Sequence, residues 1–442
     1  MRTGVLGGVR WKLEENTLVL EPKNGDEGTF TKSDKVLKLF HSTMIITRVE
    51  HIKTKGILHC KGKVLETMFA GFNKLKTADL SAFETSKAKS MRYMFYDCDL
   101  LESINLSSFD TSNVRDMRNM FQLCGFIETF DLSNFNTHKV MNMGNMFNGC
   151  NSLKTVNLSS FDTSKVVGMK CMFNGCSSLE AIDLSNFNTR KVKDMWGMFE
   201  DCTSLEALDL SNFDTRNVKD MSSMFRCCEK LKTLNVSSFN TRKTGNMGYM
   251  FRKCSALKEL NLSSFNTSNT FNMTGMFCDC NSLERIDFSQ FDPICLKSYD
   301  FGLNECPSLK EIIIPEELEK HYEAIAPLYL AASIVFFYQN RSFVKLLTKI
   351  GKLTNSNFKE EKKLLFSITA DDINGIGEWK AQQEPKVDSR LSAIFKIIKN
   401  IDIANGSTES KIKFPLKGLE TSEALSDIKA YLNGVPLEDI LA

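Results

Sequence analysis

Two ladders of sulfur-containing side chains are the residues in this sequence with the clearest capacity for chemistry. Cysteine and methionine both recur every 26 residues, the methionines in pairs such as Met195 and Met198. Thiolates can hold zinc and thioethers can hold copper(I). Core packing produces the same pattern, because free cysteine and methionine fill buried gaps well, and we expect both ladders to be reduced and buried. The cysteine ladder consists of Cys98, Cys124, Cys150, Cys176, Cys202, Cys228, Cys254, Cys280 and Cys306.

Other candidate ligands lack the spacing that their chemistry requires. The five histidines lie in different segments, and none belongs to an HExxH-like metal site. A ladder that includes Asp162 and Thr163 offers oxygen ligands for calcium, but such side chains more often bond to nearby backbone groups. The sequence has no glycine-rich phosphate loop and no nucleophile elbow. We therefore expect no catalytic residue, no cofactor and no metal site.

Cations form a ridge along the turns of three successive repeats. Arginines occupy one position at intervals of 26 residues, lysines stand beside them, and Trp196 is the one large aromatic candidate nearby. The ridge fits three interpretations: a solvated edge, a surface for an acidic protein or a glycan, or a surface for nucleic acid, which the scarcity of aromatic residues makes unlikely. The candidate binding residues are Arg190, Lys191, Lys193, Trp196, Arg216, Lys219, Arg242 and Lys243.

The elements that must position these residues follow from a 26-residue repeat that runs from about Leu65 to Ile314 without insertions. The first half of a repeat alternates like a strand with one buried face, as from Leu179 to Leu184. The second half, Met195 to Cys202, has the spacing of a short helix, and Asp194 is a candidate N-cap. We therefore predict an α/β solenoid of leucine-rich-repeat type, in which nine or ten coils stack a parallel sheet beside short helices.

One column on the predicted sheet face also carries charge, but with mixed sign. It includes Lys76, Glu102, Glu128, Lys154, Glu206 and Lys232. Charge pairs between neighbouring strands are expected to contribute only about a few tenths of a kcal/mol each, so this column is consistent with simple solvation.

The repeat wording resembles a known family. LSNFNTRKVKDMWGMFEDCTSLEAL, from Leu184 to Leu208, is similar to the bacterial surface protein 26-residue repeat, a BspA-like leucine-rich-repeat variant. The resemblance covers about 250 of the 442 residues. It implies a bacterial protein-protein interaction module, often an adhesin at the cell surface, and it identifies no ligand.

The flanks of the array divide the chain into three predicted domains. Residues 1–64 suggest a β-rich cap that begins with a hairpin of Trp11–Glu14 and Thr17–Leu20 and continues with a strand over Met44–Val49. The solenoid is predicted over residues 65–315. Residues 316–442 have helical spacing and suggest an all-α domain.

Composition leaves the partner open and bears on the location. The chain has 56 Lys and Arg against 54 Asp and Glu, so its net charge of +2 gives no general attraction to nucleic acid or membranes. The first residues lack the apolar core of a signal peptide, which predicts a cytoplasmic protein, whereas the family resemblance suggests a surface or secreted one. We expect a non-catalytic recognition scaffold, either adhesin or adaptor. The alternative is an effector or accessory subunit whose activity resides in residues 316–442.

Overall fold

The structure of the chain is a computed structural model, and it describes residues 2–30, 40, 45–292, 301–309 and 311–313. The chain forms two compact units, of which the first contains Met1–Ser255 and Asn269–Asn272 and the second contains Ala256–Ser268 and Met273–Ala442. The all-α domain predicted for residues 316–442 lies outside the described residues.

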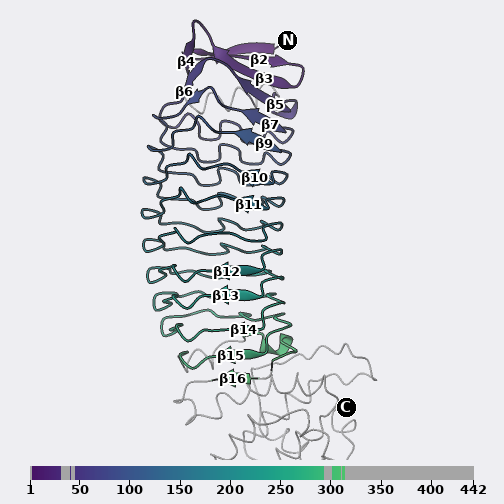
Figure 1. Cartoon of the computed structure of the whole chain (residues 1–442), viewed down its shortest axis with the longest axis vertical. Helices are drawn as coiled ribbons and strands as arrows, with labels where there is room; N and C mark the ends of the chain where they lie inside the picture. The colour runs from purple at the N-terminus through teal and green to yellow at the C-terminus, as the bar shows by residue number, and fades with distance from the viewer. Residues whose placement is uncertain (1, 31–39, 41–44, 293–300, 310, 314–442) are drawn as a thin grey trace, which may run out of the picture. The chain divides into compact units, whose positions relative to one another are not determined.

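The first unit begins with a β-rich segment that leads directly into the repeats (Figure 1). The predicted hairpin is confirmed, because β2 (Val9–Glu14) and β3 (Thr17–Pro22) pair as antiparallel strands. The predicted strand at Met44–Val49 is wrong, since Ile45–Thr47 is a 3-10 helix. One sheet of this unit has the order β1 (Arg2–Leu6), β2 (Val9–Glu14), β3 (Thr17–Pro22), β5 (His51–Thr54), β7 (Thr77–Asp79) and β9 (Ser103–Asn105). A second sheet contains β4 (Glu27–Thr29), β6 (Ile57–His59) and β8 (Phe83–Glu84).

The repeats that follow stack as a parallel solenoid, and each 26-residue turn of it is called a coil below (Figure 1). Ala207 pairs with Thr233 and Thr129 with Thr155, so the register shifts by one repeat at each step. The strands of the coils are only two or three residues long, because each is soon followed by a turn. The coil around Ile182 has no strand. The remaining strands of the first unit are β10 (Thr129–Phe130), β11 (Thr155–Val156), β12 (Ala207–Asp209) and β13 (Thr233–Asn235).

The second unit has the same parallel register in a shorter stack. Arg285 of one strand pairs with Glu259 on one side and with Glu311 on the other. Phe265 and Phe291 stack with ring centroids 6.4 Å apart. Its elements are β14 (Glu259–Leu260), β15 (Arg285–Asp287), the 3-10 helix η2 (Leu303–Glu305) and β16 (Glu311–Ile313).

The predicted helix in each repeat is wrong for the described residues, where this half of the coil consists of turns. The amide of Met198 donates to the carbonyl of Met195 in its own coil (3.2 Å), but the amide of Phe199 donates to Met224 in the next coil (2.9 Å). Gly197 and Asp201 have φ angles of 57° and 59°. An α-helix needs consecutive bonds within one segment and negative φ throughout, so this alternation excludes it. Turns at this spacing nevertheless bury the same side chains.

The predicted N-cap residues form bridges between coils instead. Asp194 pairs with Asp220, and the column continues in parallel register from Ser90 to Asn272. The Asp194 side chain does accept a backbone bond, from the amide of Trp196 at 3.1 Å. This is the Asx-turn geometry that Asp and Asn favour, and it resembles a helix cap in sequence without a helix following it.

The core confirms the prediction that the sulfur ladders are buried. Met195, Met198 and Cys202 are 0% exposed, and stacked phenylalanines such as Phe173 and Phe199 (5.7 Å between centroids) fill the space beside them. The Cys202 thiol donates to the carbonyl of Phe173 at 3.2 Å. Burial raises the pKa of equivalent thiols, for Cys150 to about 12, so these cysteines stay protonated and serve packing.

Candidate binding surface

Two buried residues in each coil force the side chains between and after them outward. In one coil Thr189 and Val192 are 1% and 0% exposed, and Arg190, Lys191 and Lys193 all lie on the surface. The Thr189 hydroxyl donates to the carbonyl of Asp214 (3.1 Å) and accepts the Asp214 amide (2.8 Å), which ties this corner of the coil to the next. The prediction that such threonines bond to backbone groups is confirmed.

The same outward positions carry cations in seven consecutive coils, and we call these residues the basic corner. No acidic residue occupies the three outward positions in any of these coils. The basic corner consists of Lys87, Lys89, Arg115, Lys139, Lys165, Arg190, Lys191, Lys193, Arg216, Lys219, Arg242 and Lys243.

The structure brings the predicted ridge residues together within three successive coils. The amide of Lys219 donates to the carbonyl of Lys193 at 2.9 Å, so these two lysines occupy directly adjacent positions. Trp196 is 41% exposed, but it lies three residues along the coil from Lys193, beyond the half-buried Asp194. Seven of the eight predicted residues therefore belong to the basic corner, and Trp196 lies beside it.

Sequence reasoning missed the other five members, Lys87, Lys89, Arg115, Lys139 and Lys165. They stand in the same 26-residue register as the predicted lysines, and that register was the signal available to find them. The prediction followed the arginine column, which contains serine or histidine in the earlier coils.

Carboxamides hold two of the lysines in place. The Lys139 ammonium donates to Asn113 Oδ1 at 2.7 Å, and that of Lys243 donates to Asn217 Oδ1 at 3.0 Å. Asn217 in turn donates to the carbonyl of Arg190 at 2.9 Å. These bonds orient the ammonium groups without neutralising their charge.

The basic corner has one internal ion pair in the part of the chain that the structure describes. Arg216 Nε lies 2.8 Å from Asp214 Oδ1, and this hydrogen bond raises the pKa of Arg216. The other eleven cations form no ion pair with a described carboxylate. Eleven of the twelve cations therefore lack an ion pair with the described carboxylates, although Asp162 and Asp214 attract Lys165 and Arg190 from beside the basic corner.

The charged column of the strand face is arranged differently. Lys154 Nζ lies 2.8 Å from Glu128 in the preceding coil, and Lys232 lies 2.8 Å from Glu206. Lys76 makes the same contact with Glu50, whose pKa is lowered chiefly by that hydrogen bond. These three lysines are therefore neutralised within the protein, and Glu102 and Glu180 add negative charge to the same column.

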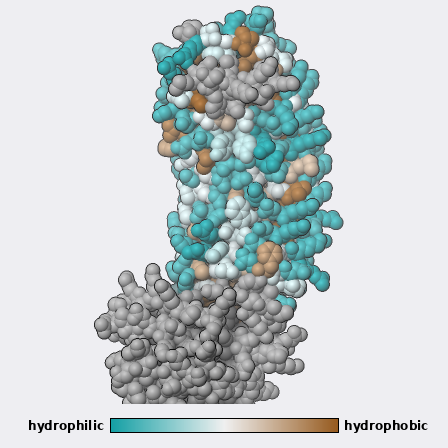
Figure 2. All heavy atoms as spheres, turned by 180° about the vertical axis from the view of Figure 1, so that it is seen from behind, coloured by the Kyte–Doolittle hydropathy of each residue, from teal (hydrophilic) through white to brown (hydrophobic). Residues whose placement is uncertain are grey.

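Hydrophobic residues do not form a broad patch on the face of the molecule shown in Figure 2, where hydrophilic residues predominate and hydrophobic ones are scattered. The exposed large hydrophobic residues include Met141 (53%) and Phe271 (70%), which occupy the same position as Lys193 in other coils. Isolated apolar residues of this kind are ordinary on a soluble surface.

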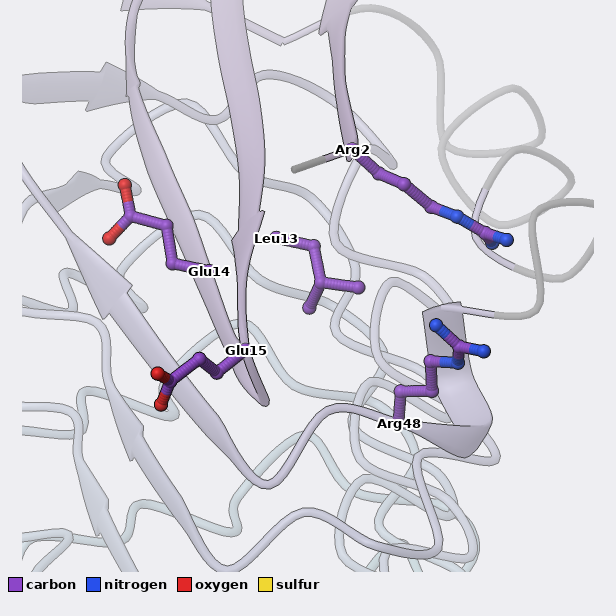
Figure 3. A pocket seen from close by; sticks show the side chains of 5 residues that line it. All are labelled: Arg2, Leu13, Glu14, Glu15 and Arg48. Atoms are coloured by element: carbon purple, nitrogen blue, oxygen red, sulfur yellow. The ribbon is translucent and has the colours of Figure 1, made fainter.

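A cavity of about 510 Å³ lies in the N-terminal sheet and is lined by Arg2, Leu13, Glu14, Glu15 and Arg48. Figure 3 shows the two arginines on one side of it and the two glutamates on the other, with Leu13 between them. The lining contains no nucleophile beside a base, which is the arrangement that covalent catalysis requires.

Within residues 2–30, 40, 45–292, 301–309 and 311–313, no group of three or more His, Cys, Asp or Glu side chains is placed to hold a metal ion. Over the same ranges, no helix has the length and apolar character needed to span a membrane.

The fold and register define the class: the array is a parallel solenoid of 26-residue coils. The chain belongs to the family described as "Mycoplasma protein of unknown function, DUF285", whose model matches residues 61–129, 126–225 and 198–312, more than half of the chain. No curated protein matches the chain.

Solved structures similar to the chain include two bacterial proteins. One is a leucine-rich repeat protein from Eubacterium ventriosum, 12% identical, covering 70% of this chain and 83% of its own, with a TM-score of 0.30. Another is a leucine rich cell surface protein from Faecalibacterium prausnitzii, 15% identical, covering 74% of this chain and 97% of its own, with a TM-score of 0.30. A third is the TLR13-ssRNA13 complex, 12% identical over 65% of this chain and 46% of the other, with a TM-score of 0.23.

Proposed function

We propose that this protein is a non-catalytic recognition scaffold that binds an acidic macromolecule through its basic corner. The observation that carries the proposal is the set of eleven cations without a described carboxylate partner, aligned in successive coils. A folded protein usually intersperses charges of both signs on its surface, as the strand face does here. A long single-sign stripe costs stability through self-repulsion, and binding an acidic partner relieves that cost.

The magnitude of each contact explains why an extended array suits this function. One exposed ion pair contributes only about 0.2–1 kcal/mol, so a single lysine cannot hold a partner. Neighbouring coils lie about 4.8 Å apart, which is less than the screening length of about 8 Å at physiological salt. The cations therefore act on a partner together, and the rigid coils keep them aligned.

The family resemblance supports an adhesin as the setting for this scaffold, and an intracellular adaptor is the alternative. Affinity capture with the intact protein, from a lysate of its own organism and separately from host-cell matrix, distinguishes the two. Retention of matrix or surface components supports the adhesin. Retention of cytosolic components alone contradicts it and favours the adaptor.

The direct test of the proposal is removal of charge from the ridge with a matched control. The ridge variant carries Arg190→Gln, Arg216→Gln and Arg242→Gln, and the control carries Lys76→Gln, Lys154→Gln and Lys232→Gln on the strand face. Both lose three positive charges, so they have the same net charge. Polyglutamate and heparin serve as acidic probes, titrated by calorimetry at about 50 mM and about 200 mM salt.

We expect at least one probe to bind the unaltered protein, and the ridge variant to lose about tenfold in affinity while the control loses less than twofold. Binding should weaken with salt, because a cationic stripe releases counterions from a polyanion. If neither probe binds, or if both variants lose affinity equally, the basic corner is not the binding surface.

A further inference from the structure

We propose that the partner of the basic corner is a linear acidic polysaccharide, with carboxylate or sulfate groups on its sugars, which lies along the stacked coils and contacts all seven. This inference rests on the proposed function and adds the chemical class and the extent of the contact. Four observations carry it: the length of the stripe, its charge density, its lack of apolar anchors and its lack of aromatic platforms.

The stripe has the dimensions of an extended polymer. The basic corner begins in the coil that contains Lys87 and ends in the coil that contains Arg242. Backbone hydrogen bonds join neighbouring coils, such as those from the Lys193 amide to the Val167 carbonyl and from the Lys219 amide to the Lys193 carbonyl, both 2.9 Å. Six steps of about 4.8 Å give a length of about 29 Å. Twelve cations over that length are about one per 2.4 Å, which approaches the density of about one charge per 1.7 Å on a DNA duplex. The linear charge density of the basic corner is therefore comparable with that of a polyelectrolyte.

A folded protein is a poor match for this surface. Protein interfaces derive most of their affinity from aromatic or apolar anchors buried at their centre. In the central coils the corresponding positions hold Lys139, Lys165 and Lys191, and the exposed Met141 is the one large apolar side chain among them. Lysine predominates over arginine, and its flexible stem and point charge suit a partner whose anionic groups have no fixed planar arrangement.

Nucleic acid fits less well than polysaccharide. Proteins that bind single strands stack successive bases on rows of aromatic side chains. Here Trp196 and Phe271 are exposed but three coils apart in the sequence register, and Trp196 lies beyond Asp194, outside the stripe. Readout of a duplex requires a helix or a two-stranded ribbon in the major groove, and the basic corner is built from turns. Sugar carboxylates and sulfates require only charge and hydrogen-bond donors.

The donors for such groups are already oriented. Lys139 and Lys243 each use one ammonium hydrogen for an asparagine carboxamide, at 2.7 and 3.0 Å, and each ammonium keeps two further donors. Less side-chain freedom is lost when these lysines bind, which lowers the entropic cost of contact. The two asparagines of this column therefore leave Lys139 and Lys243 partly ordered before the polymer arrives.

The test uses heparin fragments of defined length with the full chain. We expect affinity to rise with fragment length until the fragment spans about 29 Å, and to level off beyond that length. A second variant, Lys87→Gln with Lys89→Gln and Arg115→Gln, removes three charges from the other end of the stripe. Long fragments should bind about tenfold more weakly to the variant at either end of the basic corner, and less than twofold more weakly to the strand-face control.

The outcomes separate this inference from the proposed function. If only the Arg190, Arg216 and Arg242 variant weakens binding, or if short fragments bind as tightly as long ones, the extended contact is rejected and the proposed function stands. If polyglutamate or a single-stranded oligonucleotide of equal charge binds more tightly than heparin, the polysaccharide assignment is rejected. If no acidic probe binds at all, both proposals fail.

Discussion

On the strand face, Lys154 lies 2.8 Å from Glu128 of the preceding coil, whereas at the basic corner Arg190 occupies the same position as Arg216 and Arg242 in the next two coils. Both columns are generated by the same 26-residue register, which places equivalent residues about 4.8 Å apart. The strand face mixes the two signs, and three of its lysines are each paired with a glutamate of the preceding coil. The basic corner repeats one sign, so the register multiplies a charge there instead of cancelling it. A repeat array therefore adds the charge at one position over many coils, and the result is a strong local electrostatic field.

The largest difference in stability between the two regions should come from removal of the Thr189 hydroxyl, which lies beneath the basic corner. Thr189→Val leaves the part-buried amide and carbonyl of Asp214 without their partner, and each unsatisfied group costs about 1–3 kcal/mol when it is fully buried. We expect a loss of about 2–4 kcal/mol in the free energy of unfolding, measured with denaturant. Thr189→Ser keeps the hydroxyl and should lose much less. Thr155→Val, on the exposed strand face, should change stability by under about 0.5 kcal/mol, and an equal loss at both sites would contradict the comparison.

A third charged cluster, in the N-terminal sheets, should respond to pH. His59 bonds to Glu27 (3.0 Å) and Glu84 (3.1 Å), and these two hydrogen bonds raise its pKa, with Glu27 contributing most. The folded state therefore holds the His59 proton more tightly, so its stabilisation is full below about pH 6.5 and is lost as the pH rises through the higher folded pKa.

The measurement is the melting temperature between about pH 5.5 and about pH 8.5, compared with that of His59→Gln. We expect the unaltered protein to lose more stability than the variant as the pH rises over this range. Parallel curves would show that the cluster does not titrate.

The smallest expected effect is the change in stability when a single lysine loses its charge. This change should have opposite signs on the strand face and at the basic corner. Lys154→Gln breaks an exposed pair and should cost about 0–1 kcal/mol of unfolding free energy. Lys193→Gln removes one of two like charges in adjacent coils and should raise stability by about a few tenths of a kcal/mol at low salt. Denaturant melts at low and high salt test this, and the gain at the corner should shrink as salt increases. A destabilising Lys193→Gln would mean that the basic corner is not self-repelling.

The burial pattern was predictable from the sequence, and the backbone conformation was predicted wrongly. Met195, Met198 and Cys202 are buried as their spacing predicts, yet turns and helix bury the same positions when side chains recur at three and four residues. A partial signal was the residue type at the two left-handed positions, which is Gly, Asn or Asp in some coils, although residues such as Tyr93 and Leu123 also adopt positive φ there. Gly149 and Asp201 occupy one of these positions, Asn145 and Gly197 occupy the other, and Gly, Asn and Asp tolerate positive φ.

The binding surface was predictable only in part. Arg190, Arg216 and Arg242 are identical residues at identical spacing, whereas Lys139 and Lys165 are each the one member of the basic corner in their own coil. Recognition of those lysines required knowledge of which positions point outward, and that depends on the buried Thr and Val beside them. The pairing of Lys243 with Asn217 could not be predicted, because it depends on the distance between two side chains of neighbouring coils.

The bridges from Asp194 to Asp220 and from Asp220 to Asn246 connect residues that are 26 positions apart. A gain or loss of one whole repeat would preserve every bond of this kind, while a change of any other length would break the ladder at that point. The array can therefore lengthen or shorten during evolution only in whole steps, each of about 4.8 Å. Recombination between neighbouring repeats would then vary the span of the molecule while leaving each individual contact intact.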